Sequence, residues 1–197
     1  MARNNESSTD SAETLVLRAR RGEADAFSEL IGRYERMALS VAFSVLGNAD
    51  SAGDVVQEAF VNAWQRIGDL KEPARFATWL CGIARNLAID VHRRGRNSRL
   101  SIDAQGFDAM AIADHRPAAD PTGDMDRRER NARVAEALGS LNESTRTAVI
   151  MRYYDGLSSK QIGEAMNLSP AAVDMRLSRA REQLKQLLEP AEGSIGN

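Results

Sequence analysis

The sequence predicts an all-α protein made of two small helical domains joined by a flexible acidic linker. Apolar residues recur every three or four positions over most of the chain, which is the spacing of one helix face. Between about residues 96 and 126 this periodicity stops, and prolines, glycines and aspartates take its place. Near the C-terminal end, a short and a longer helical pattern follow each other with their own start and stop signals.

These breaks divide the 197 residues into segments. Residues 1–12 are rich in Asn, Ser, Thr and Asp, and we expect a disordered N-terminal extension there. Helical domains are predicted over 13–95 and 127–190. The linker covers 96–126, and 191–197 form a short tail.

The composition excludes several classes of protein. The net charge of −2 carries no global signature of a nucleic-acid binder. The one cysteine, Cys81, excludes an internal disulfide, and we expect a buried inert thiol there rather than a redox sensor. The histidines lack metal-ligand spacing, so we expect neither a metal nor a cofactor. Without a long apolar run or a signal-peptide core, the chain is expected in the cytoplasm with no membrane insertion.

Charge is nevertheless distributed unevenly along the chain. Residues 85–99 contain arginines and, against them, only the acidic residue Asp90. Residues 100–126 contain aspartates and, against them, only Arg116. A cationic segment followed by an anionic one cancels in the sum but not in space.

In chain order, the first domain is predicted to contain a short helix near residues 15–20 and longer helices at 26–45, 54–67 and 75–95. Glycine and asparagine end the helix at 26–45, and glycine and proline punctuate the loop at 68–73. In the second domain, a pattern resumes at residue 127 and another helix is predicted from residue 143 to 154.

The helix at 54–67 has an apolar stripe for packing and a separate group of residues on another side. Asp54, Gln57, Glu58 and Val61 form this group, which we name the docking patch. They lie three or four residues apart and are therefore neighbours on the helix surface. The pattern alone allows two interpretations, a solvated polar face or a docking site for another protein.

The helix at 75–95 combines aromatic and cationic residues. Phe76 and Trp79 suit stacking on unpaired bases, and Arg75, Arg93 and Arg94 suit binding to phosphates. Core packing is the alternative for at least one aromatic residue, because both lie at core spacing. The arginine pair is also what the negative end of a helix dipole favours.

The last two helical patterns have the geometry of a helix-turn-helix. Ser158 and Gln161 fit a capping box, and Asn167 suits the end of the short helix. Ser169 then caps a second helix, with Pro170 at its first position. Such a helix can lie in the major groove of DNA and present arginines to base edges. An ordinary helical hairpin with a solvated charged face is the alternative.

Together these residues resemble a known family, the bacterial RNA polymerase sigma factors of the extracytoplasmic-function (ECF) type. The resemblance covers about residues 24–188 without the linker, and the motifs occur in the family's order. In the first domain the matching residues are Asp54-Val55-Val56-Gln57-Glu58-Ala59-Phe60 with Ala63-Trp64, Phe76-Ala77-Thr78-Trp79-Leu80, Ile83 to Asp90, and Arg93-Arg94. In the second domain they are Ala137-Leu138 with Leu141, Arg152-Tyr153, Asp155 to Ser158, Gln161-Ile162, and Val173 to Glu182.

The resemblance implies a sigma-2-like domain over 13–95 and a sigma-4-like helix-turn-helix domain over 127–190. It implies a protein that is not an enzyme, binds core RNA polymerase at the β′ clamp and the β flap, and directs promoter recognition, DNA opening and transcription initiation. Promoter DNA and an anti-sigma factor are the further partners it implies. The acidic linker resembles the family's connector, which runs through the polymerase toward the RNA exit channel.

The resemblance also implies roles for single residues. The docking patch would bind the polymerase. Recognition of the minus-ten promoter element, with one base flipped out of the stack, is implied for Leu70, Lys71, Arg75, Phe76, Trp79, Arg85, Asn86, Arg93 and Arg94. Recognition of the minus-thirty-five element is implied for Ser169, Ala171, Ala172, Asp174, Met175, Arg176, Ser178 and Arg179.

The sequence departs from the family pattern at several positions. Members often carry a basic residue and a serine where this chain has Asp174 and Met175. An aspartate there would repel phosphate or accept a hydrogen bond from a cytosine amine. Proline is common at the position of Asn142, tyrosine at that of Cys81, and an acidic residue at that of Gly53.

Two other functions fit parts of the sequence. A stand-alone helix-turn-helix transcription regulator, with an N-terminal helical interaction domain, would account for the C-terminal half. A helical adaptor that binds only proteins would not need the arginines of the second helix. The docking patch and the aromatic-cationic helix together favour the sigma factor over the stand-alone regulator, and the arginines of the second helix favour it over the adaptor.

Overall fold

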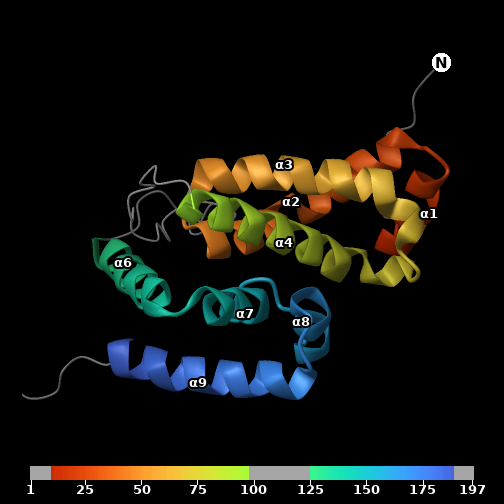
Figure 1. Cartoon of the computed structure of the whole chain (residues 1–197). Helices are drawn as coiled ribbons and strands as arrows, with labels where there is room; N and C mark the ends of the chain where they lie inside the picture. Colours follow the sequence, from red (N-terminus) through yellow and green to blue (C-terminus); the bar gives the residue numbers. More distant parts are fainter. Residues whose placement is uncertain (1–9, 98–124, 189–197) are drawn as a thin grey trace, which may run out of the picture.

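The computed structural model describes residues 10–97 and 125–188, and the secondary structure in both ranges is helical, as predicted (Figure 1). The α-helices are α1 (Ala12–Arg20), α2 (Ala24–Leu46), α3 (Ala49–Arg66), α4 (Phe76–Asn97), α6 (Met125–Ser140), α7 (Glu143–Tyr153), α8 (Ser159–Met166) and α9 (Pro170–Leu188). Short 3₁₀ turns at Ile67–Asp69 and Pro73–Arg75 lie in and beside the predicted loop. Nearly all of the predicted extension, linker and tail lies outside the described residues.

Local signals in the sequence set the helix ends. Asn48 and Asn142 accept N-cap hydrogen bonds from backbone amides at the starts of α3 and α7. Asn142, at a position where proline is common in the family, starts α7 through this side-chain cap. Gly47 ends α2 in the left-handed conformation, with φ of 68°. At α8 both bonds of the capping box from Ser158 and Gln161 are present, as predicted.

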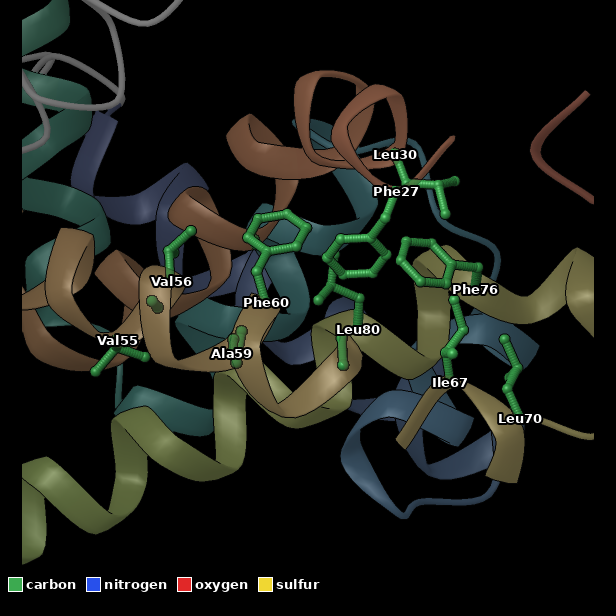
Figure 2. Close-up of a cluster of buried hydrophobic side chains, with 14 of the residues drawn as sticks. Phe27, Leu30, Val55, Val56, Ala59, Phe60, Ile67, Leu70, Phe76 and Leu80 are labelled. Carbon is green, nitrogen blue, oxygen red and sulfur yellow. The ribbon is translucent and has the colours of Figure 1, made fainter. Parts of the chain in front are cut away.

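The first core lies between α1, α2, α3 and α4, with α2 packed against the other three. The ring of Phe27 meets those of Phe60 and Trp64 at centroid distances of 6.3 and 4.9 Å. At the start of α4, the ring of Phe76 lies 5.4 Å from that of Tyr34. Such aromatic pairs contribute about 0.5–1.5 kcal/mol beyond the burial of their area. Figure 2 shows the cluster, which also contains Leu30, Val55, Val56, Ala59, Ile67, Leu70 and Leu80.

The second core lies between α7, α8 and α9, and α6 packs on α9. Its turn from α8 to α9 is tight because Asn167 is left-handed, with φ of 56°. The amide of Leu168 donates to the carbonyl oxygen of Gly163 at 2.8 Å. A Cβ atom on Gly163 would lie 2.5 Å from the carbonyl oxygen of Leu168, so a glycine is required there. This requirement was not recognised in the sequence.

The two domains touch, which the sequence did not predict. Helix α2 packs against α7, and α4 packs against α8. In Figure 1, α7 and α8 lie along α4, and α9 lies on their far side. Val41 of α2 and Cys81 of α4 are fully buried and belong to the second core. We name these contacts of α2 and α4 with α7 and α8 the interdomain interface.

Candidate functional site

The docking patch lies on the outer face of α3. Asp54, Gln57, Glu58 and Val61 are all exposed, and the side chain of Val61 is 55% exposed. The opposite face of the helix, including Val55, Val56 and Ala59, is buried in the first core. The helix therefore presents two carboxylates and an apolar side chain on one continuous surface.

Trp64 adds to this surface and was missed in the sequence. Its spacing predicts a core residue, and one side of its ring does pack on Phe27. The residue is nevertheless 38% exposed, and it lies about one helical turn beyond Val61. A large apolar ring beside the docking patch is the kind of residue that anchors protein interfaces.

Two residues predicted to recognise the minus-ten element are instead in the first core. Phe76 is fully buried against Tyr34 and Trp79, and Leu70 is 6% exposed. Neither side chain faces solvent, so we remove both from the predicted DNA surface. The alternative of core packing is correct for Phe76, while Trp79 is half-buried with its ring centroid 6.1 Å from that of Phe76.

Five of the other predicted residues of this group are exposed on α4 and on the segment before it. Lys71, Asn86 and Arg75 are exposed. Near the end of α4, Arg93 and Arg94 are exposed and interact with Asp90 of the same helix. These last contacts are within one helical turn, so they leave the cations on the surface.

Arg75 and Arg85 are paired with carboxylates of the second domain. Nη1 of Arg75 lies 3.0 Å from Oε1 of Glu164 on α8, and its Nε lies 2.8 Å from Glu72. Nη2 of Arg85 lies 3.4 Å from Oε1 of Glu143 on α7, and the Arg85 side chain is only 13% exposed. Nothing local in the sequence marks Glu143 and Glu164, because they are far along the chain from their partners.

The second helix of the helix-turn-helix, α9, presents an open face. Ser169 caps it by accepting a hydrogen bond from the amide of Ala172 at 3.2 Å. Val173 and Leu177 point into the second core. The exposed predicted residues are Ser169, Ala171, Asp174, Met175, Ser178 and Arg179, and Ala172 and Arg176 are partly exposed.

Asp174 and Arg176, also predicted to contact DNA, have partners within the domain. The Oγ atom of Ser159 donates to Oδ1 of Asp174, and Arg152 donates to the same Oγ at 2.7 Å. Arg152 lies 3.9 Å from Asp174, so its guanidinium offsets the carboxylate charge. Arg176 donates to the hydroxyl of Ser144 on α7. These contacts connect α9 to α7 and α8.

Cys81 is buried, as expected. It is fully inaccessible, and burial is the main reason that the pKa of its thiol is raised far above the usual range. The thiol is therefore unreactive while the interdomain interface is closed. Within the two described ranges, no helix is long and apolar enough to cross a membrane.

Comparisons with protein families match both domains. A family model described as Sigma-70 region 2 matches residues 30–98. A second, described as Sigma-70, region 4, matches residues 131–184. The two matches correspond to the first and second helical domains.

Curated proteins are similar over nearly the whole chain. The identity is 34% to the RNA polymerase sigma-H factor of Pseudomonas aeruginosa, over 89% of this chain and 93% of that protein. It is 31% to the ECF RNA polymerase sigma-E factor of Escherichia coli K12, over 90% and 94%. The match to the Xanthomonas campestris relative RfaY, at 32%, spans only 41% of that protein.

Solved structures share the arrangement of helices. CnrH, in complex with the cytosolic domain of CnrY, matches with a TM-score of 0.65 and 29% identity, over 91% of this chain and 97% of that one. The sigma factor RpoE of Bartonella quintana, in complex with the anti-sigma factor NepR, matches with a TM-score of 0.60 and 21% identity, over 82% and 96%. The second likeness concerns the fold alone.

Proposed function

The chain belongs to the ECF RNA polymerase sigma factors. From this membership we infer that α3 binds the polymerase, that α4 recognises the minus-ten element, and that α9 recognises the minus-thirty-five element. Such a factor directs RNA polymerase to promoters for transcription initiation, and it is a non-enzymatic subunit of the polymerase. Its partners are core polymerase and promoter DNA, and with these partners we assign it to the cytoplasm.

The docking patch on α3 is the proposed polymerase contact. All members of the patch are exposed, and the core behind them holds the helix in place. Glu58 and Asp54 supply negative charge, and Val61 and Trp64 supply apolar area at the same surface. A polymerase surface with basic and apolar residues would fit this patch, and the β′ clamp is the proposed partner.

The outer side of α4 and the loop before it are the proposed reader of the minus-ten element. Lys71, Arg75, Trp79, Arg85, Asn86, Arg93 and Arg94 remain candidates once Phe76 and Leu70 are assigned to the core. Trp79 has a partly exposed ring for stacking, and the cations suit phosphates. Phe76 packs against Trp79 and is fully buried, so we assign it no contact with DNA.

The exposed face of α9 is the proposed reader of the minus-thirty-five element. Met175 suits the methyl group of a thymine, and Arg179 suits a guanine edge or a phosphate. Asp174 and Arg176 are proposed to set the position of α9 through Ser159 and Ser144. The carboxylate of Asp174 then has a partner within the protein, and its side chain, which is 63% exposed, remains part of the face proposed to meet DNA.

An anti-sigma factor is a further proposed partner. CnrH, which is 29% identical to this chain, is held in a complex with the cytosolic domain of CnrY. The resemblance of this chain to the family also implies an anti-sigma factor. Contact with the β flap of polymerase is proposed for the second domain.

The observation that carries the proposal is the presence of the docking patch, exposed on α3, in the same chain as a complete helix-turn-helix. The test is run-off transcription with core polymerase and a library of promoter sequences. Transcripts that depend on this protein and share two sequence elements are expected. A stand-alone regulator would instead bind duplex DNA tightly without polymerase, and that result would contradict the proposal.

A further inference from the structure

Helix α1 has no part in the proposed contacts with polymerase or DNA, yet it packs against the segment that joins α3 to α4. It touches both 3₁₀ turns of that segment, Ile67–Asp69 and Pro73–Arg75. In Figure 1, α1 lies at the end of the first domain where the chain passes from α3 into α4. We name residues 68–75 the minus-ten loop, because the proposed contact with the minus-ten element begins there. Helix α1 is therefore a direct neighbour of this loop.

Three apolar side chains attach the minus-ten loop to the first core. Ile67 and Leu70 are each 6% exposed, and Phe76 is fully buried. Figure 2 shows these three residues at one end of the core cluster. Between them, Lys71 and Arg75 remain exposed. Hydrophobic burial is not directional, so it sets where the loop is attached but not how its peptide groups are oriented.

Arg20, the last residue of α1, supplies a directional contact at the start of the loop. Its Nε atom donates a hydrogen bond to the carbonyl oxygen of Ile67 at 3.1 Å. Ile67 is the C-cap residue of α3, and the carbonyl groups at the end of a helix lack partners within the helix. The helix dipole also favours a cation at this end. Arg20 therefore fixes the peptide group from which the chain enters the minus-ten loop.

Helix α1 is itself held in place by other contacts. Arg18 forms ion pairs with Asp10 at 2.6 Å and with Glu23 at 2.8 Å. Glu23 is the N-cap residue of α2, so this pair connects α1 to the start of the next helix. On the inner side of α1, Leu15 is fully buried in the first core. Arg20 thus extends from a fixed helix, and its guanidinium can act as a fixed donor.

Stability alone does not account for an arginine at this position. The Nη2 atom of Arg20 is buried and has no hydrogen-bond partner among the described residues. A buried donor without a partner is unfavourable, and this cost offsets the gain from the single bond at Nε. An unbranched apolar side chain would fill similar space without that cost. The arginine therefore fits a requirement for a directional bond to Ile67 better than a requirement for stability.

We propose that Arg20 is a positioning residue for minus-ten recognition, which orients the minus-ten loop by holding the carbonyl group of Ile67. This role rests on the proposed function of the loop and α4. Arg20 acts through the loop and does not touch DNA. A base taken out of the stack is recognised by groups that must be placed within a fraction of an ångström, so a small rotation of the loop weakens recognition.

Promoter discrimination by the holoenzyme tests this role. The probes are the promoter with the highest yield from the library and its single-base variants in both elements. Arg20→Met removes the donor and should lower discrimination among minus-ten bases about fivefold, the usual effect of one hydrogen bond. Discrimination at the minus-thirty-five element should not change, because α9 belongs to the other domain. Arg20→Lys retains a cationic donor and should stay within about twofold of the wild type.

A merely structural role for Arg20 predicts a different pattern, with a loss of stability and an equal loss at both promoter elements. We expect the thermal midpoint of Arg20→Met to lie within about 4 °C of the wild type, since the lost bond is offset by removal of the unpartnered donor. Arg21→Met is the matched control, because Arg21 is exposed and pairs with Glu23. It should leave discrimination at both elements unchanged.

Four results would overturn the proposal. They are wild-type minus-ten discrimination in Arg20→Met, an equal loss at both elements, a lysine variant no better than the methionine variant, and an Arg20→Met chain that does not fold. The proposed function is tested separately by the wild-type protein. If the wild type gives no polymerase-dependent transcripts, the function fails. If the wild type is active and all variants match it, only the role of Arg20 fails.

Discussion

The surfaces of α3 and α4 differ in how much of each is available in the closed protein. The docking patch is exposed throughout, and its helix has contacts mainly with the first core. The cations of α4 are partly occupied by Glu143 and Glu164 of the other domain. The docking patch is therefore accessible in this arrangement, whereas two of the cations on and next to α4 already have partners.

The largest expected effect is on the docking patch. Glu58→Arg combined with Gln57→Ala should weaken binding to core polymerase about a hundredfold, or ~2.7 kcal/mol, because a charge at the centre of an interface is reversed. Co-purification or fluorescence titration with core polymerase measures it. Glu164→Arg, a reversal at the interdomain interface, should bind core polymerase with at least wild-type affinity. Equal losses for both variants would remove the distinction between the two surfaces.

Two glycine substitutions compare the tolerance of the helix-turn-helix domain and of α3 for an added methyl group. Gly163→Ala should destabilise the helix-turn-helix domain by about 1–3 kcal/mol, because the new Cβ would meet a backbone carbonyl at 2.5 Å. Gly53→Ala is the matched control on α3, where no atom lies within 4 Å of the added Cβ. It should be neutral or stabilising by about 0.5–1 kcal/mol. Urea unfolding followed by circular dichroism measures the free energy of unfolding of each variant. Equal changes for the two variants would contradict the assignment.

Two arginines on α9 test which side of that helix faces DNA. Arg179→Ala should weaken minus-thirty-five recognition by the holoenzyme about tenfold, since its side chain is exposed. Arg176→Ala removes the bond to Ser144 and should lower the stability of the domain more than it lowers sequence discrimination. Binding to promoters with altered minus-thirty-five bases measures the discrimination. A larger loss of discrimination for Arg176→Ala would reverse the two roles.

The smallest expected effect is a pH dependence of the interdomain interface. Burial raises the pKa of Asp155 to about 7, against the opposing effects of the Ser40 hydrogen bond and the charge of Arg36. In the open form the carboxyl group is expected near its usual pKa, so the closed form binds the extra proton. The closed form should therefore lose stability as the pH rises from about 4 through 7.

Maleimide labelling of Cys81 measures this opening when each rate is divided by that of the unfolded chain at the same pH. This ratio cancels the pH dependence of the reactivity of the thiol itself. The pH dependence that remains is that of the opening equilibrium. Asp155→Asn should abolish the pH dependence while the chain remains folded. A dependence that persists unchanged in this variant would assign the effect to another group.

Much of the fold was predictable from short stretches of sequence. The capping box of Ser158 and Gln161, the left-handed Asn167 and the terminating Gly47 all behave as predicted. The exposure of the docking patch also followed from its spacing along one helix. These features depend on hydrogen bonds and packing between residues a few positions apart, so a local pattern is enough to identify them.

Other features depended on which helices meet. The spacing of Phe76 and Trp79 is the same as that of core residues, and only the position of Tyr34 decides that Phe76 is the buried ring. The roles of Asp174 and Arg176 depended on Ser159 and Ser144, which belong to other helices. A helical pattern specifies a face but not what packs against it.

The sequence by itself determined the helices, their caps, the helix-turn-helix and the family to which the chain belongs. Tertiary structure alone decided that the two domains pack together, through pairs such as Ser40 with Asp155 and Ser44 with Thr147. The physical reason is that helix periodicity and capping are encoded within a few residues. These two interdomain pairs join positions more than a hundred residues apart, and no local pattern records them.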